Sequence, residues 1–339
     1  MRINLPRIGL GGAPLGNMFH PVTEEQADAT LVAAWQAGFR YFDTSPHYGA
    51  GLAEERFGRL LRSRPRNEYL LSTKVGRVLE PAAAPENARP FVDELPNRRI
   101  LDYSAAGARR SLEDSLVRMG VERIDLVFIH DVSEDQHGPR WREYFAEAMA
   151  GAAKELTAMR EEGLIRGWGL GVNLVEPCRL ALEQADPDLF LLAGRYSLLD
   201  HREALETLFP VCIERGVGIV VGGPFNSGVL AGGDHYEYDR VPDEVRGRAQ
   251  RLMALCARFG IDSRAAALQF CLAHPAVLSV IPGTATPARP AQYMAQLQAE
   301  VPRAFWQALR EEELVGADVP LPVQDRRSGC EGRCGDRVR

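Results

Sequence analysis

The hydrophobic and polar positions along the chain follow two alternating periodicities. Eight short runs rich in aliphatic residues have the length of buried β-strands, and they cover residues 7–12, 39–44, 69–75, 124–130, 167–172, 189–194, 217–222 and 277–283. The segments between them carry apolar residues at helical spacing. The first of these begins with a capping pair, Thr23 and Gln26, and ends at Gly38. The pattern predicts strands that alternate with helices over nearly the whole chain.

Eight strands separated by helices are what a closed barrel requires, so we expect an α/β fold of the (β/α)8 TIM-barrel class. The rival architecture, an open doubly wound sheet, usually carries a G-x-G-x-x-G turn that leads into a helix. The glycine-rich segment 9–16 has a different spacing, and Pro14 interrupts a helix start there. Long connections follow the third strand (76–103) and the seventh strand (222–241). Loops of this length on one face of a barrel are usually functional.

Composition and charge are those of an ordinary globular protein. Of the 339 residues, 45% are hydrophobic and 25% are charged, and the formal net charge is −6. This charge gives no reason to expect nucleic acid or an anionic membrane as a partner. No apolar run is long enough to cross a bilayer, and Pro6 interrupts the apolar start too early for a secretory signal. We expect a cytoplasmic monomer or weak homo-oligomer, with one barrel domain over 1–318 and a polar tail over 319–339.

The six cysteines predict neither a metal site nor a disulfide framework. Four of them lie in apolar segments and are expected to be small core residues: Cys178, Cys212, Cys256 and Cys271. Cys330 and Cys334 lie in the polar tail, where a pair supplies too few ligands for a metal. A disulfide between them is not expected in a reducing compartment. The tail is expected either to be disordered or to fold over the mouth of a neighbouring molecule.

Three titratable residues end neighbouring strands, and a fourth lies on the loop that follows one of them. Asp43, Lys74 and His130 close the second, third and fourth predicted strands, and Tyr48 follows the second. Each alone has a structural explanation, as a turn former, a snorkelling lysine, an interior histidine or a half-buried aromatic. At the carboxyl ends of barrel strands, however, they would share one mouth.

Together these four side chains have a chemical logic. A phenol with a pKa near ~10 carries protons poorly at neutral pH, and an ammonium beside it is expected to lower that pKa. The carboxylate would keep the lysine charged, and the imidazole would orient the reacting oxygen. The set predicts a proton relay for interconversion of C–OH and C=O. The hydride must come from a cofactor, because no side chain supplies one.

The segments "GFRYFDTSPHYGAGLAEERFGRLL", "LSTKVGR" and "DLVFIHD" closely resemble the aldo-keto reductase superfamily, and the resemblance covers roughly Leu5 to Leu314. It implies a barrel that binds a nicotinamide cofactor at its mouth without a Rossmann motif. It also implies that Tyr48 is the general acid/base, that Lys74 and Asp43 tune it, and that His130 orients the substrate.

The resemblance also implies the cofactor site. After the eighth strand, Gly283, Thr284 and Arg289 would hold the adenosine phosphate, and Gln292 would contact adenine. Gly283 replaces a lysine that is common in NADP-preferring members, so either NADP or NAD is expected. After the seventh strand, Gly222 stands where many members carry an aromatic that stacks on the nicotinamide. The backbone of that loop would cradle the pyrophosphate, and Asn173 would hold the carboxamide. The loop residues concerned are Pro224, Ser227 and Gly228.

"GGPFNSGVLAGG" and "AAALQFCLAHPAVLSVIPG" are most similar to the branch of D-threo-aldose (L-fucose) 1-dehydrogenases, which includes pyridoxal 4-dehydrogenases. This branch implies oxidation of an aldose at C1 to a lactone. The alternatives are a pyridoxal 4-dehydrogenase, a general aldehyde or ketone reductase, and a non-catalytic barrel that senses nucleotides. The expected partner is therefore a small sugar or aldehyde. Candidate substrate contacts are Met18, His47 and His130, with Phe19, Asp131 and Trp141 as further residues of the mouth.

Overall fold

The structure is a computed structural model that describes residues 3–322. Its centre is a sheet of eight parallel strands, in the order β1-β2-β3-β6-β7-β8-β9-β12. Their bounds are β1 Leu10–Gly11, β2 Tyr41–Asp43, β3 Leu70–Val75, β6 Leu126–His130, β7 Gly167–Val172, β8 Leu189–Ala193, β9 Gly218–Gly222 and β12 Val277–Ile281. The barrel closes where the Gly9 amide donates to the Val280 carbonyl (2.9 Å) and the Val280 amide donates to the Arg7 carbonyl (3.0 Å). The predicted (β/α)8 barrel is confirmed.

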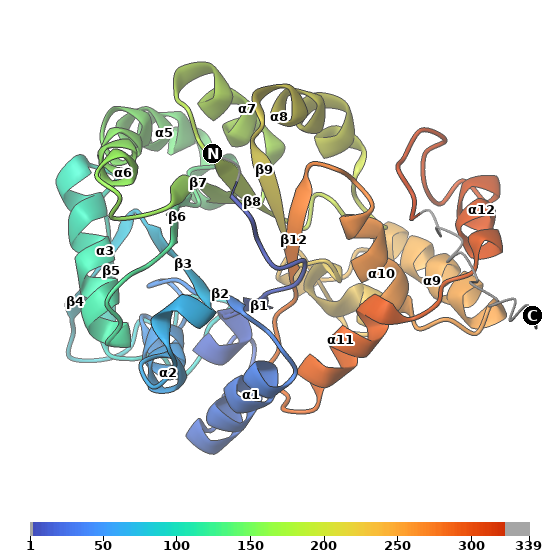
Figure 1. The fold of residues 1–339 in the computed structure, drawn as a ribbon, viewed down its shortest axis with the longest axis horizontal. Helices are drawn as coiled ribbons and strands as arrows, with labels where there is room; N and C mark the ends of the chain where they lie inside the picture. The colour runs from blue at the N-terminus through green and yellow to red at the C-terminus, as the bar shows by residue number, and fades with distance from the viewer. Residues whose placement is uncertain (1–2, 323–339) are drawn as a thin grey trace, which may run out of the picture.

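Helices surround the strands on the outside of the barrel (Figure 1). They are α1 Glu24–Gln36, α2 Leu52–Leu61, α3 Ala105–Met119, α4 Glu134–His137, α5 Trp141–Ala150, α6 Ala152–Glu161, α7 Val175–Gln184, α8 Phe209–Arg215, α9 Asp243–Arg258, α10 Ser263–Leu272, α11 Arg289–Gln298 and α12 Arg303–Glu311. Shorter helical turns are η1 Ala13–Gly16, η2 Arg66–Glu68, η3 Gly138–Arg140, η4 Ala204–Leu208 and η5 Asn226–Ala231. The predicted cap of α1 is present, because the Thr23 hydroxyl accepts a hydrogen bond from the Gln26 amide.

The core has two parts, one on each face of the strands. Side chains inside the barrel form a small cluster that includes Tyr41, Phe128 and Leu191. A much larger cluster lies between the strands and the helices. A Cβ at Gly169 of β7 would lie 1.6 Å from the Leu189 carbonyl oxygen, so only glycine lets these two strands pair at their observed spacing. The filled interior leaves the carboxyl ends of the strands as the open mouth.

Both long loops of the mouth contain a β-hairpin that the sequence did not predict. After β3, strand β4 (Arg77–Pro81) pairs with β5 (Asn97–Leu101). After β9, strand β10 (His235–Tyr236) pairs with β11 (Asp239–Arg240). These hairpins give the loops a defined shape over the mouth.

Some predicted features differ from the structure or lie outside it. The predicted first strand, 7–12, is regular only at Leu10–Gly11, with an isolated bridge from Ile8 to Val280. Of the predicted tail, 323–339 lies outside the described residues, and so do Cys330 and Cys334. Within 3–322, the longest helices are too short or too polar to traverse a bilayer.

Candidate active site

Asp43 and Lys74 form a buried ion pair at the ends of β2 and β3. The Lys74 ammonium lies 2.8 Å from Asp43 Oδ2 and donates to the Thr44 carbonyl at 2.8 Å. The Ser72 hydroxyl donates to the other carboxylate oxygen at 2.6 Å. Burial raises the pKa of Asp43, while Lys74 and then Ser72 oppose that rise. The hydrogen bonds fix the direction of the lysine side chain toward the mouth.

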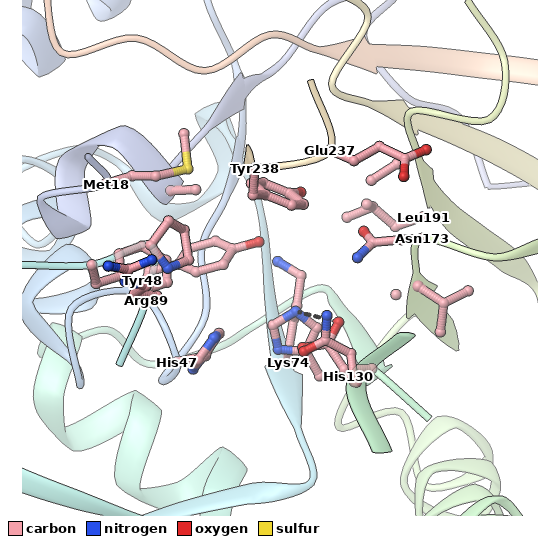
Figure 2. A pocket seen from close by; sticks show the side chains of 18 residues that line it. Met18, His47, Tyr48, Lys74, Arg89, His130, Asn173, Leu191, Glu237 and Tyr238 are labelled. Atoms are coloured by element: carbon pink, nitrogen blue, oxygen red, sulfur yellow. Dashed lines mark ion pairs between the residues drawn. The ribbon is translucent and has the colours of Figure 1, made fainter. Parts of the chain in front are cut away.

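Tyr48 lies next to this pair, on the loop after β2. The Lys74 ammonium is 4.6 Å from the centre of the Tyr48 ring, and the rings of Tyr48 and His130 lie 5.9 Å apart. Figure 2 shows the Tyr48 hydroxyl and the Lys74 ammonium extending into the same space. The structure therefore brings Asp43, Tyr48, Lys74 and His130 together at one wall of the mouth.

The expected lowering of the Tyr48 pKa is wrong for this structure. Burial raises the pKa of Tyr48 well above its ordinary value, Asp43 and Asp131 raise it further, and only Arg77 opposes them. The Lys74 charge does not prevail, because Asp43 already neutralises it at 2.8 Å. The phenol is therefore protonated at neutral pH.

His130 is a neutral imidazole held at its back by Ser45. Burial lowers the pKa of His130 well below its ordinary value, and the charges of Arg77 and Lys74 lower it further. Its Nδ1 lies 3.2 Å from the Ser45 hydroxyl, and its backbone carbonyl accepts from the Tyr103 hydroxyl at 2.8 Å. The other ring nitrogen, Nε2, lies 3.5 Å from Oδ1 of Asp131, and both residues line the mouth.

A cavity of about 220 Å³ opens in front of Tyr48, Lys74 and His130. Two predicted substrate contacts, Met18 and His47, line it. The His47 ring packs against Phe91 at 5.2 Å, and its buried Nδ1 has no hydrogen-bond partner within residues 3–322. Several polar residues complete the walls: Arg89, Asp131, Gln136, Asn173 and Glu237. We call this space the substrate cavity.

Two of the residues weighed from sequence do not line the substrate cavity. Trp141 is buried at the start of α5 and packs against Phe145. Phe19 instead lines a neighbouring cleft of about 410 Å³, and its ring stacks on His235 of the β10–β11 hairpin. Tyr48 and Tyr238 line both spaces. Tyr238 lies in a polar loop, and apart from its aromatic side chain no sequence pattern indicated its position in the site.

The cleft, which we call the dinucleotide cleft, runs from Tyr48 to the start of α11. Most of the predicted cofactor residues line it, namely Pro224, Ser227, Gly228, Gly283, Thr284 and Arg289. Gln292 does not, because it is exposed on α11 and accepts from Arg289 at 2.9 Å. Asn173 lines the substrate cavity instead and donates to Asp135. Arg264 also lines the cleft, so Arg289 is not its only cation.

The residues of this cleft fit a dinucleotide. The chain after β9 turns through left-handed conformations at Ser227 (φ 55°) and Gly228 (φ 107°), and both residues line the cleft. At its far end, Thr284 caps the turn that leads into α11, and Arg289 stands in the first turn of that helix. Gly222 has little room for a side chain, because a Cβ there would approach Leu191 to 3.2 Å. The site would therefore hold phosphates with backbone amides and guanidinium groups.

The loop after β1 is fixed from below by Arg56 of α2, which is almost fully buried. Its guanidinium donates to the carbonyls of Leu15 and Val22 at 2.7 Å each. It also donates to the Asn17 side chain at 2.9 Å. One side chain thus determines the path of the loop that carries Met18.

Comparison with known proteins agrees with this geometry. The model of the aldo/keto reductase family ("Aldo/keto reductase family") matches residues 7–312. A pyridoxal 4-dehydrogenase from Microbacterium luteolum is 40% identical over 328 residues, covering 92% of this chain and 95% of that protein. A D-threo-aldose 1-dehydrogenase from a Pseudomonas species is 38% identical over 323 residues, covering 92% and 95%. An L-galactose dehydrogenase from Arabidopsis thaliana is 27% identical over 286 residues, covering 83% and 81%.

Solved structures share the fold. The holo form of an aldo-keto reductase from Bacillus halodurans, AKR11C1, superposes with a TM-score of 0.70 at 24% identity, covering 92% of this chain and 93% of that one. The glycerol dehydrogenase AKR11B4 from Gluconobacter oxydans gives a TM-score of 0.69 at 21% identity, covering 95% of each. With the family match over most of its length, this chain belongs to the aldo/keto reductase family of NAD(P)-dependent oxidoreductases.

Proposed function

We propose that the protein oxidises a cyclic hemiacetal at its anomeric carbon to a lactone, with an aldose of the L-fucose (D-threo) type as substrate. The observation that carries this proposal is the position of Tyr48, whose ring lines both the substrate cavity and the dinucleotide cleft. A proton acceptor at this junction reaches a substrate hydroxyl while the adjacent carbon faces the cofactor.

Each member of the set has a defined task in this reaction. Tyr48 accepts the proton of the anomeric hydroxyl, and the His130 imidazole hydrogen-bonds the same oxygen. Lys74, held by Asp43 at 2.8 Å, stabilises the phenolate form of Tyr48, which is the form that can accept this proton. A nicotinamide held in the dinucleotide cleft would supply the acceptor for the C1 hydride. The products are a lactone, a reduced nicotinamide and one proton.

The names of the relatives support this substrate class. An aldose and pyridoxal share a chemical property, since each carries a hydroxyl that closes on its own aldehyde to give a cyclic hemiacetal. The two relatives near 40% identity are named for these two substrates. Pyridoxal oxidation is therefore the second candidate.

The walls of the substrate cavity favour a polyhydroxylated ligand over a plain aldehyde. Arg89, Gln136 and Glu237 contribute donors and acceptors around its rim. All three side chains are exposed, and Gln136 and Glu237 also contact Asp135 and Arg195, so a sugar ring would add hydrogen bonds here that a plain aldehyde cannot make.

A panel of substrates and cofactors tests the proposal. Purified protein is mixed with L-fucose, pyridoxal or a simple aldehyde, and with NAD⁺ or NADP⁺ (NADH or NADPH for the aldehyde), and the absorbance of reduced nicotinamide is followed. We expect reduced nicotinamide to form when L-fucose is the substrate. Turnover of pyridoxal alone would select the second candidate. Reduction of simple aldehydes without oxidation of either hemiacetal would refute both.

A further inference from the structure

A buried ion pair stands beside the catalytic set, in a position that the reaction described above does not use. Arg77, the first residue of β4, lies 2.9 Å from Asp131, which follows β6. Their exposed fractions are only 8% and 6%. Such a pair is costly to bury, and replacement by apolar residues often stabilises a protein. A pair retained at the wall of a cavity therefore calls for a functional explanation.

The backbone directs the Asp131 carboxylate toward the substrate cavity. Asp131 has a left-handed backbone (φ 58°), which most residues adopt only at a cost of about 1 kcal/mol or more. Hydrogen bonds on both sides hold this conformation, from its amide to the Gly171 carbonyl and from the Ser133 amide to its own carbonyl, each at 2.9 Å. The carboxylate thus lines the cavity instead of continuing along the strand.

One oxygen of the carboxylate is occupied and the other faces His130. Arg77 contacts Oδ2, whereas Oδ1 lies 3.5 Å from His130 Nε2. Among the residues that the structure describes, the buried Nη1 of Arg77 has no hydrogen-bond partner, so Asp131 is the carboxylate that balances this guanidinium.

The tautomer of His130 follows from Ser45 and Asp131. The Ser45 hydroxyl lies 3.2 Å from His130 Nδ1 and can donate to it, while its oxygen accepts from the His47 amide at 3.0 Å. Because Nε2 lies 3.5 Å from the Asp131 carboxylate, the tautomer with the hydrogen on Nε2 avoids placing a lone pair against that charge, and Nδ1 is then the acceptor. A donor, Nε2–H, and an acceptor, Asp131 Oδ1, therefore stand side by side at the wall.

We propose that Asp131 recognises the hydroxyl on the carbon next to the reacting carbon. While His130 Nε2–H donates to the anomeric oxygen, Asp131 Oδ1 accepts from the 2-hydroxyl. Arg77 acts as a positioning residue that keeps the carboxylate ionised and oriented. This inference rests on the proposed function and narrows its substrate class to hemiacetals that carry an adjacent hydroxyl. A substrate without that hydroxyl leaves a buried carboxylate oxygen unpaired, which a polar site rejects strongly.

The test compares L-fucose with 2-deoxy-L-fucose, with one saturating cofactor. For the unmodified protein we expect kcat/KM to be roughly 100-fold higher for L-fucose, in line with the loss of one hydrogen bond to a charged group. In Asp131→Asn, which tolerates the left-handed backbone, L-fucose should lose most of this advantage while 2-deoxy-L-fucose changes little. Asp131→Ala removes both carboxylate oxygens. In this variant kcat/KM for L-fucose should be within about threefold of kcat/KM for 2-deoxy-L-fucose.

Two further variants separate recognition from folding. Arg77→Lys keeps the charge but loses the planar guanidinium, so the substrate ratio should fall part of the way. Glu134→Gln neutralises an exposed carboxylate three residues away and should leave the ratio unchanged. Melting temperature and nucleotide binding confirm that each variant is folded.

The outcomes distinguish the inference from the function on which it rests. Equal turnover of both sugars by the unmodified protein, or an equal loss for both sugars in Asp131→Asn, would overturn the role of Asp131 and leave the aldose dehydrogenase standing. If neither sugar is oxidised by the unmodified protein, the proposed function and this inference both fail.

Discussion

Phe19 and His235 stack across the mouth of the barrel, with ring centroids 4.1 Å apart and planes inclined by 20°. Phe19 belongs to the loop after β1, and His235 begins the β10–β11 hairpin after β9. Their contact joins two loops that both contribute residues to the dinucleotide cleft, Phe19 from the first and Tyr238 from the second. We therefore expect the stack to restrain a nucleotide that enters or leaves the cleft.

Loss of this stack should speed nucleotide exchange. An aromatic pair is worth about 0.5–1.5 kcal/mol, so His235→Ala should raise the dissociation rate constant of NADH or NADPH by up to about tenfold. Stopped-flow fluorescence measures this rate. His235→Phe keeps an aromatic ring at the position and should restore slow release. Equal rates in all three proteins would show that the stack does not restrain the nucleotide.

Replacement of Tyr48 separates catalysis from binding. Tyr48→Phe removes the hydroxyl but keeps the ring, so turnover should fall about 10²–10⁴-fold while nucleotide affinity changes little. Tyr69→Phe is the matched control, because its hydroxyl donates to the Leu61 carbonyl away from the mouth. Absence of turnover in the unmodified protein, with nucleotide binding intact, would instead favour a nucleotide sensor.

The rate of oxidation should rise with pH. Because burial holds the pKa of Tyr48 well above its ordinary value, the proton-accepting phenolate is scarce at neutral pH. Its fraction grows about tenfold for each pH unit below that pKa, so kcat/KM for oxidation should increase from pH 7 to pH 9, whereas reduction should not. A pH–rate profile in both directions checks this. A pH-independent oxidation rate would mean that another group accepts the proton.

Two guanidinium groups at the end of the dinucleotide cleft should govern the choice of cofactor. Arg289 and Arg264 both line it, and Arg264 is also held by the Ala231 carbonyl at 2.9 Å. If Arg289 contacts a 2′-phosphate, Arg289→Ala should weaken NADPH binding by roughly tenfold or more and NADH binding much less. Isothermal titration with both nucleotides measures the difference. Arg303→Ala, outside the cleft, serves as the control.

Protonation of a buried histidine should destabilise the fold in mild acid. Burial lowers the pKa of His274 to about 4, whereas the unfolded chain protonates near ~6.5. Between these values only the unfolded state gains the proton, so stability falls as pH falls, by about 1.4 kcal/mol per pH unit. His274→Asn can retain the acceptor for the Ala276 amide without titrating. Urea unfolding at pH 7 and pH 5 should show a smaller loss in this variant, by about 2 kcal/mol.

The spacing of apolar residues along the sequence predicted the strands, and the titratable residues at the ends of those strands predicted the catalytic set. Asp43, Lys74 and His130 each fall at the carboxyl end of a buried apolar run, and parallel strands bring such ends to one mouth. The same pattern could not show that Arg77 meets Asp131. Arg77 begins a hairpin whose partner strand returns after a connection of 82–96, too long to carry a turn signature.

Properties that depend on three-dimensional burial also escaped prediction. From sequence, Lys74 beside Tyr48 suggests an acidified phenol. In the structure, Asp43 pairs with Lys74 and neutralises its charge. Burial is then the largest effect on Tyr48, and it raises the pKa of the phenol. Tyr238 was equally hidden, since a hairpin of two-residue strands leaves no periodic signal.

Because Arg56 anchors the loop after β1, the two loops that line the dinucleotide cleft should differ in mobility. The buried Arg56 guanidinium donates to two carbonyls of the β1 loop, so we expect this side of the cleft to stay fixed. The β10–β11 hairpin is exposed at Tyr238 and is held by single contacts, from Glu237 to Arg195 and from the Tyr238 amide to the Ser227 hydroxyl, so we expect it to open more readily. Hydrogen exchange should be slow at Leu15–Asn17 and fast at Glu237–Arg240, and adding nucleotide should slow only the latter.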